Sequence, residues 1–591
     1  MTDTAPLHTV PLREVAHARS GEKGNNSMVS VIAFNEADYP LLLEQVTEDA
    51  VRSVFGPITK GSIRRFEVPA IGALNFVLDE VLEGGRSRTL AFEESGKALS
   101  SLMLTLPLRV PSGHARTPTP EAAPRPTLQR TEGRSVRLGS ATAWSRDRFE
   151  PAADLLDRGN LDYLCFETMS EVTMSAAQAS RLEDDATPLY DPYLVARMKP
   201  ILRQAKAQGV RIITNQGWLD PIGAALRLVE LAGELGIENL RIAAVDGGIL
   251  TDRITDFGVN CLEDGRPVAE RRDTIVSAEA YMGAAGIVEA LALGADVVVT
   301  TRVADACLYL GPLAHEFGWS LEDYERTAQG MIIGHLMECG AQVCGGYFAD
   351  PGYKDVPRLA EVGNPIAEVS GDRVILSKLP DSGGLLSPAT CKEQLLYEVG
   401  NPAEYLCPDC VADLTKVSFE QIGLDEVAVH FAPGAGQPKP PTLKVLVGVR
   451  EGFMTEEMVI FAGPGALTRA RATEALLWDR FRRIELRAEE IRFDYLGINA
   501  VHREASPPVE HEPYEVILRI GLKTATRIEA DKLRREVDPL AVNGLAGTGK
   551  WATSSPGSRV RPVVGLNSCL VPRELVPTRV VLAEVLVKAS A

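Results

Sequence analysis

Residues 277–305 read SAEAYMGAAGIVEALALGADVVVTTRVAD, and this stretch contains the pattern that decides the fold. An amphipathic helix is expected over Ser277–Leu293, followed by Gly294 and a short apolar strand over Asp296–Thr300. Glycine just after a helix is the usual left-handed C-terminal residue. A continuous apolar strand is typical of a sheet that is covered on both faces. The stretch therefore predicts one helix and one strand of a parallel α/β sheet.

The same alternation runs through residues 135–345 and predicts a mostly parallel, doubly wound sheet. Further strands are expected at Val136–Ser140, Tyr163–Phe166, Val210–Thr214 and Leu240–Val245, with helices at Pro151–Arg158, Asp191–Ala207 and Ile222–Leu235 between them. Residues 346–591 lose this regularity and predict a mixed α+β portion.

The first 108 residues have short mixed elements and predict a small α+β domain. Within it, residues 19–27 are polar and glycine-flanked, and we expect them to form a loop. Residues 109–134 are rich in proline, which fixes φ and lacks a backbone donor, so this stretch predicts an extended linker. The large domain then covers residues 135–591.

The composition limits the classes of function. The chain has 591 residues and a formal net charge of −18, which argues against a nucleic-acid partner. Its most apolar stretch, residues 278–301, contains three acidic side chains, so no membrane span is expected. The N-terminus lacks the pattern of a secretory signal. Nine scattered cysteines fit a reducing compartment, and we expect a soluble cytoplasmic protein.

Polar residues gather where the predicted parallel strands end. Ligands bind beyond the carboxyl ends of such strands, because loops and helix N-termini meet there. The residues that follow the four strand ends are Glu167 and Glu171; Asn215 and Gly217; Asp246, Gly247 and Gly248; and Thr300, Thr301, Arg302 and Asp305.

These groups predict a site for a small anionic or carbonyl ligand. Arg302 can hold a carboxylate or phosphate in a two-pronged contact, with Asp305 to orient it. The glycines let backbone N–H groups approach a ligand closely. Glu167 and Glu171, if helical, lie one turn apart, where like charge and burial raise one pKa toward neutrality and provide a general acid–base. The alternative is that these residues cap helices or are solvated surface charges.

A second cluster has His335, Glu338 and Cys339 at helical spacing. Its His-x-x-Glu pattern fits a general base or part of a metal site, but the second histidine of a zinc-protease helix is missing. A capping or core role is the alternative. The main interpretation includes no metal, and a metal-dependent enzyme using His335, Glu338 and Asp350 remains open.

Several segments together resemble the acyclic terpene utilisation (AtuA) family across nearly all of residues 136–591. They include residues 159–167, 170–174, 280–283, 294–305, 338–350, 393–398 and 463–465. Residues 18–25 and 69–75 resemble the small AtuA-like domain, which has a ferredoxin-like fold. Two features depart from the family pattern: the small domain comes first, and Thr301 stands where glycine is common.

The resemblance implies catabolism of branched, terpenoid-derived acids, commonly handled as coenzyme A thioesters. The resemblance does not settle the reaction. From the site residues we expect a lyase, a hydratase or dehydratase, that uses Glu167, Glu171 or His335 in proton transfer. Arg19, Ser20, Lys23 and Asn25 of the small domain are expected to close over the ligand. No cofactor is predicted beyond coenzyme A as part of the substrate, and a homo-oligomer is expected. The rival interpretation is a non-catalytic acyl-CoA-binding or pathway-organising subunit.

Overall fold

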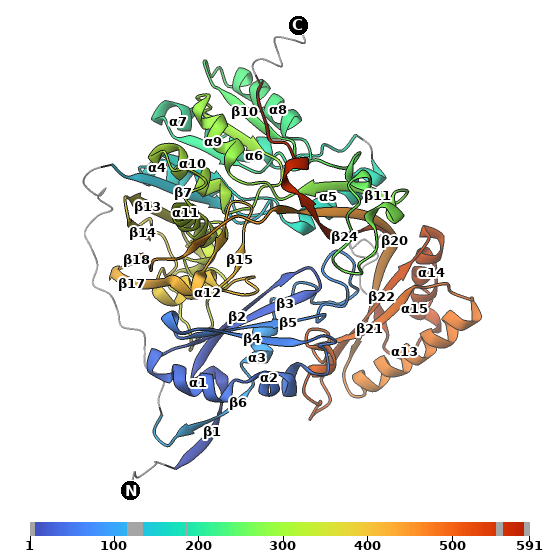
Figure 1. Ribbon diagram of the computed structural model, residues 1–591. Coiled ribbons are helices and arrows are strands. Elements are labelled where there is room, and N and C mark those ends of the chain that lie inside the picture. The colour runs from blue at the N-terminus through green and yellow to red at the C-terminus, as the bar shows by residue number, and fades with distance from the viewer. Residues whose placement is uncertain (1–5, 115–133, 185, 551–559, 584–591) are drawn as a thin grey trace.

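The computed structural model describes residues 6–114, 134–184, 186–550 and 560–583 (Figure 1). Its central ten-stranded sheet contains five adjacent parallel strands in the order β7-β8-β9-β12-β10. Their bounds are β7 Val136–Thr142, β8 Tyr163–Phe166, β9 Arg211–Thr214, β12 Val297–Thr300 and β10 Ile242–Asp246. The predicted parallel α/β core is thereby confirmed.

Antiparallel strands extend this sheet at both edges. On the β7 side lie β13 Pro365–Ser370, β14 Arg373–Lys378, β18 Glu426–Phe431 and β17 Val417–Gly423, and on the β10 side lies β25 Arg579–Leu582. The short strands β15 Tyr405–Leu406, β16 Val411–Ala412 and β19 Gly436–Gln437 form a separate small sheet. The sheet is therefore mixed, with its parallel part in the middle.

Helices cover both faces of the parallel strands. Successive strand residues point to opposite sides, so a continuous apolar strand has an apolar face on each side to bury. Leu164 and Phe166 pack with one group of helices, whereas Tyr163 and Cys165 pack with the other. The first group is α4 Glu150–Arg158, α6 Leu194–Met198, α7 Leu202–Gln208 and α8 Pro221–Glu234. The second group is α9 Ala285–Ala292, α10 Cys307–Phe317, α11 Tyr324–Met337 and α12 Pro388–Leu395.

A second, antiparallel sheet has the order β11-β20-β22-β21, and β23 and β24 also pair with β20. Its strands are β11 Ile275–Ala280, β20 Thr442–Ala462, β22 Glu515–Thr524, β21 Glu490–Leu496, β23 Gly549–Lys550 and β24 Arg561–Pro572. The helices α13 Ala466–Arg483, α14 Arg527–Val537 and α15 Leu540–Asn543 pack beside it. The prediction of one helix over Ser277–Leu293 is wrong in its first part, because residues 275–280 pair with β20 instead.

The N-terminal domain, called the head below, has an antiparallel sheet in the order β2-β3-β5-β4. Its elements are β2 Ala16–Lys23, β3 Asn26–Ala33, β5 Ala73–Leu78, β4 Ile63–Val68, α1 Tyr39–Gln45, α2 Glu48–Phe55 and α3 Leu99–Met103, with the pair β1 Leu7–Pro11 and β6 Pro107–Pro111. The expected loop over residues 19–27 is a β-hairpin, because β2 and β3 pair from Ala16–Ala33 to Lys23–Asn26.

The head lies against the rest of the chain, called the body below (Figure 1). The buried Asn75 side chain of β5 donates to the carbonyl oxygens of Val399 and Gly400, at 2.7 and 2.8 Å. Strand β6 continues to Pro111, past the expected start of the linker at residue 109, and residues 115–133 lie outside the described residues. In the described part of the chain, no helix combines the length and apolarity that crossing a membrane requires.

Candidate functional site

Three strand-end loops of the parallel sheet meet at Asp305. Glu167 follows β8, Asn215 follows β9, and Arg302 and Asp305 follow β12. Arg302 Nη1 donates to Asp305 Oδ1 at 2.7 Å, and Asn215 Nδ2 donates to the same oxygen at 3.4 Å. The parallel strands run side by side, so residues far apart in the sequence come together at this edge.

Arg302 is a buried cation with three kinds of partner. It is 3% exposed, pairs with Asp305, and donates to the carbonyl oxygen of Met169. Its guanidinium carbon lies 4.2 Å from the centre of the Tyr281 ring, which adds a cation–π contact. Burial disfavours the charge, but Asp305 and Tyr281 outweigh it and raise the pKa of Arg302. The site therefore keeps a fixed positive charge.

Glu167 and Asp305 are carboxyl groups that hold protons more tightly than usual. Glu167 is 7% exposed; burial and then the charge of Asp305 raise its pKa well above the ordinary value, against the opposing effect of Arg302. For Asp305, burial raises the pKa to about 6, with Glu338 adding to the shift and Arg302 opposing it. Burial and neighbouring charge thus favour the protonated form of Glu167, next to a second carboxyl group whose pKa is also raised.

Glu171 is held in the opposite state. It is the first residue of α5, Glu171–Glu183, and accepts hydrogen bonds from the Tyr281 hydroxyl at 3.1 Å and Lys444 Nζ at 3.0 Å. Burial would raise its pKa, but Lys444 and Lys23 outweigh burial and lower it to about 2. Glu167 precedes the helix, so the two glutamates do not lie one turn apart on a helix as expected.

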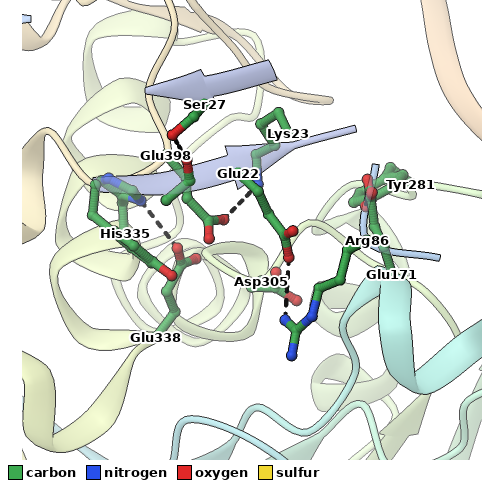
Figure 2. Close-up of polar contacts among 12 residues, drawn as sticks. Glu22, Lys23, Ser27, Arg86, Glu171, Tyr281, Asp305, His335, Glu338 and Glu398 are labelled. Carbon is green, nitrogen blue, oxygen red and sulfur yellow. Dashed lines mark hydrogen bonds and ion pairs between the residues drawn. The ribbon is translucent and has the colours of Figure 1, made fainter. Parts of the chain in front are cut away.

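His335 and Glu338 form a hydrogen-bonded pair next to these groups. His335 lies in the last turn of α11, and its Nε2 is 3.1 Å from the Leu395 carbonyl oxygen, to which it must donate. Its Nδ1 lies 3.0 Å from Glu338 Oε1. Figure 2 shows this pair, with Asp305 and Glu398 nearby.

The head supplies a cation to the same place. Lys23, at the end of β2, donates to Glu398 Oε2 at 3.0 Å (Figure 2). Burial would lower its pKa, but Glu398, Tyr281 and Glu171 outweigh burial and raise it. We call the whole group the central cluster; its members are Lys23, Glu167, Glu171, Tyr281, Arg302, Asp305, Glu338, Glu398 and Lys444.

The central cluster is deep but reaches solvent. The side chains of Lys23, Asp305 and Glu398 are 53%, 24% and 21% exposed. Beside Glu171 lies a cavity of about 30 Å³ that is also lined by Glu22 and Gly24 of the hairpin turn. A space of this size holds a single water molecule.

The other three head residues have different positions. Arg19 donates to Gln342 and lies between the rings of Tyr347 and Tyr397. The Ser20 hydroxyl bonds to the backbone of residues 97 and 100, and the Asn25 side chain accepts from the Gly84 N–H. Of the four, the structure brings only Lys23 to the central cluster.

Several residues of the body that were predicted to bind the ligand instead contact other parts of the protein. Asp246 pairs with Arg579 of β25, and Gly247 packs against the carbonyl of Pro577. A Cβ at Gly248 would meet the Met282 sulfur at 2.7 Å, and one at Gly217 would meet the Thr300 carbonyl oxygen at 2.5 Å, so neither glycine faces open space.

The two threonines after β12 also bond to nearby backbone. The Thr300 hydroxyl donates to the carbonyl oxygen of Thr301 at 2.8 Å. The Thr301 hydroxyl donates to the carbonyl oxygen of Trp218 at 2.7 Å. Both side chains are buried and belong to the wall behind Arg302.

The three residues of the metal alternative do not come together. His335 pairs with Glu338, whereas Asp350 accepts a hydrogen bond from Arg13 at 2.6 Å. Within the residues that the structure describes, no group of three or more histidine, cysteine, aspartate or glutamate side chains is placed to hold a metal ion.

Sequence reasoning assigned no site role to Tyr281, Lys444 or Glu398. Tyr281 follows β11 and Lys444 lies in β20, both in the second sheet, while Glu398 follows α12. Glu398 has a φ of 58°, a left-handed conformation that is rare outside glycine and is often found at functional sites. None of the three follows a parallel strand, the signal that pointed to Glu167, Glu171, Arg302 and Asp305.

Comparison with known proteins gives two matches. The model of the family described as acyclic terpene utilisation family protein AtuA matches residues 136–582. The model of the AtuA ferredoxin-like domain matches residues 10–109. No curated protein and no solved structure matches the chain.

Proposed function

The chain belongs to the acyclic terpene utilisation (AtuA) family, and from this premise we propose that it acts as a hydro-lyase on a branched acyl-CoA or a small carboxylate. The family places the protein in acyclic terpene utilisation. The observation that carries the reaction class is the pairing of Glu167, whose pKa is raised well above its usual range, with Asp305, whose pKa is about 6, next to Arg302.

In this proposal, two carboxyl groups divide the proton transfers of a hydration. Asp305 takes a proton from water while the water oxygen bonds to the β-carbon of an α,β-unsaturated substrate. The π electrons of the double bond move toward the carbonyl, and the α-carbon then takes a proton from Glu167. Return of the Asp305 proton to Glu167, directly or through water, restores the starting state. Dehydration follows the same steps in reverse.

The cations of the central cluster suit the charge that forms in between. Electron density reaches the carbonyl oxygen of the substrate as the carbon–oxygen bond forms, and a fixed cation stabilises that enolate-like oxygen. Arg302 stays charged and buried, and Lys23 and Lys444 add two further positive charges. The combination of three cations with the carboxyl groups of Glu167 and Asp305 suits acid–base chemistry on a carbonyl substrate.

The hairpin turn of the head is the part that would admit a substrate. The cavity beside Glu171 holds only about 30 Å³, and Glu22 and Gly24 form part of its wall. Lys23 is the most exposed member of its ion pair with Glu398, at 53% against 21%. In the proposed cycle, this ion pair opens when substrate enters and forms again over the bound substrate.

The test is turnover of branched 2-enoyl and 3-hydroxyacyl thioesters of coenzyme A and of the free acids, followed by chromatography. Glu167→Gln should lower turnover roughly 10²–10⁴-fold, the usual contribution of a general acid. Glu183→Gln is the matched control, because Glu183 ends α5 on the surface and pairs with Arg527. Thermal unfolding should be close to wild type in both variants.

Two results would contradict the proposal. The first is unchanged turnover in Glu167→Gln. The second is tight binding of the thioesters by wild-type protein without any turnover, which would support a non-catalytic binding subunit instead.

A further inference from the structure

A second polar site lies where the head meets the body, away from the central cluster. It is a cavity of about 520 Å³, which we call the seam cavity. Arg13, Arg19 and Leu104 of the head line it, together with Tyr347, Phe348 and Lys354 of the body. Its volume is within the range of cavities that bind small organic molecules.

Arg19 is the unusual residue of the seam cavity, because it is a buried cation without an acid. It is 5% exposed, and within the described part of the chain no carboxylate forms an ion pair with it. Its contacts are with neutral groups. Nη2 donates to Gln342 Oε1 at 2.5 Å and Nη1 to the Tyr347 carbonyl oxygen at 3.4 Å, and the guanidinium carbon lies 4.2 Å from the centre of each of the Tyr347 and Tyr397 rings. Its Nε has no hydrogen-bond partner.

The other two cations of the seam cavity are already neutralised. Arg13 donates to Asp350 at 2.6 Å, and Lys354 donates to Glu393 at 2.8 Å. Of the three cations, Arg19 is therefore the one with no carboxylate in direct contact among the described residues; Glu393, whose pKa Arg19 helps to lower, acts on it only at longer range. Burying a guanidinium without a counter-ion is costly, and an anion in the cavity would remove that cost.

The backbone around Arg19 is also held in an uncommon conformation. Tyr347 has a φ of 65°, which is strained for an aromatic residue, and this residue provides both a ring and a carbonyl oxygen to Arg19. Strain of this kind is common at ligand clamps. Leu104, Phe348, Ala18 and Ala349 give the cavity an apolar part of its wall, and the polar part also includes Ser100, Ser101, Thr105 and Asp350.

We propose that the seam cavity is a binding site for an organic monocarboxylate, with its carboxylate on Arg19 and its hydrocarbon part against Leu104 and Phe348. The guanidinium is the side chain best suited to a carboxylate, because it donates two parallel hydrogen bonds. The apolar wall favours a ligand with a hydrocarbon body over a bare inorganic anion. This site is separate from the central cluster and does not depend on the proposed reaction.

Isothermal titration calorimetry on the full-length protein tests the proposal. The probes are medium-length branched monocarboxylates, their primary amides, their coenzyme A thioesters and inorganic phosphate. The free acids should bind, and the amides and phosphate should bind much more weakly. Arg19→Gln should weaken binding of the acids roughly tenfold to hundredfold, the contribution of a charged hydrogen bond.

Three further variants locate the binding. Arg64→Gln is the matched control and should leave the affinity unchanged. Arg64 lies on β4, at the other edge of the head sheet, and pairs with Asp79. Leu104→Trp keeps Arg19 but fills the seam cavity, and should also abolish binding. Glu167→Gln should bind the acids like wild type, whatever its effect on turnover.

The proposal is overturned if the folded Arg19→Gln protein binds the acids with wild-type affinity. It is also overturned if no acid binds, if the amides bind as well as the acids, or if Leu104→Trp leaves affinity intact. Loss of binding in Glu167→Gln, with full binding in Arg19→Gln, would show that the acids bind at the central cluster and not in the seam cavity.

Discussion

At the scale of single residues, the main feature is that two neighbouring glutamates are held in opposite protonation states. Glu171 receives hydrogen bonds from Lys444 and Tyr281, and its pKa falls to about 2. For Glu167, burial and the charge of Asp305 outweigh the opposing charge of Arg302 and raise its pKa. The difference comes from the charges around each side chain: lysines stabilise the ionised form of Glu171, whereas burial and Asp305 favour the protonated form of Glu167.

This separation predicts the pH dependence of turnover. In the hydration direction, the rate should rise with pH through about 6 as Asp305 loses its proton, and fall at higher pH as Glu167 ionises. Glu338 raises the pKa of Asp305, so Glu338→Gln should move the acidic limb of the profile to lower pH. Rates measured across pH for wild type and Glu338→Gln check this, and a shift to higher pH would exclude the assignment of Asp305.

At the scale of elements, strand β2 connects the head to the body through alternate residues. His17, Arg19, Gly21 and Lys23 are spaced by two, so they lie on one side of the strand. His17 contacts Glu393, Arg19 contacts Gln342, and Lys23 contacts Glu398. A single strand thereby reaches both the seam cavity and the central cluster.

Gly21 is where this strand lies closest to the body, which gives a prediction. A Cβ at residue 21 would lie 2.5 Å from Glu398 Cγ and 2.6 Å from Tyr397 Cε2. Gly21→Ala should therefore lower the free energy of unfolding by about 1–3 kcal/mol and reduce turnover by displacing the Lys23–Glu398 pair. Thermal unfolding and activity assays measure the two effects.

The control lies three residues further along the same hairpin. Gly24 has a φ of 60°, and a Cβ added there would have no atom within 4 Å. Asparagine tolerates this left-handed backbone conformation. Gly24→Asn should therefore leave the free energy of unfolding nearly unchanged. Equal damage from both substitutions would show that the hairpin turn, and not close contact at Gly21, sets the effect.

At the scale of the whole molecule, buried polar groups join the head to the body. His17 Nδ1 lies 2.6 Å from Glu393 Oε1, and Lys354 Nζ donates to the same oxygen. Burial lowers the pKa of His17, Glu393 opposes the shift, and Lys354 and Lys392 add to it. His17 is therefore neutral in the folded protein at neutral pH.

A lowered histidine pKa makes the stability of this interface depend on pH. The unfolded chain takes up a proton at His17 below about pH 6.5, whereas the folded chain does not until lower pH. The free energy of unfolding should therefore be highest above that pH and fall as the pH drops below it. His17→Gln should flatten this slope in denaturant titrations at several pH values.

His430→Gln is the control for this prediction, because His430 lies on the surface with its side chain 53% exposed. It should leave the slope as in wild type. A His17→Gln protein with the full wild-type slope would mean that other groups control the acid sensitivity.

The two sheets differ in how well the sequence predicts them. Strand Tyr163–Phe166 has the predicted bounds, because a short continuous apolar run between amphipathic helices is typical of a strand in a parallel sheet buried on both faces. Residues 277–280 were predicted as the start of a helix but belong to β11, since their pairing partner in β20 lies more than 160 residues away. Short apolar runs do not distinguish helix from strand without that partner.

The order of residues along the chain was enough to bring Glu167, Asn215, Arg302 and Asp305 to one edge of a parallel sheet, because strand ends are a local feature. Which of these groups keeps its proton was settled only in three dimensions. Tyr281, Lys444 and Glu398 arrive from another sheet or a distant helix end, and no local pattern marks them. Lys23 was expected to close over the ligand, but its partner Glu398 was not. Charge and burial act through space, so their effects on each carboxyl depend on contacts between remote segments.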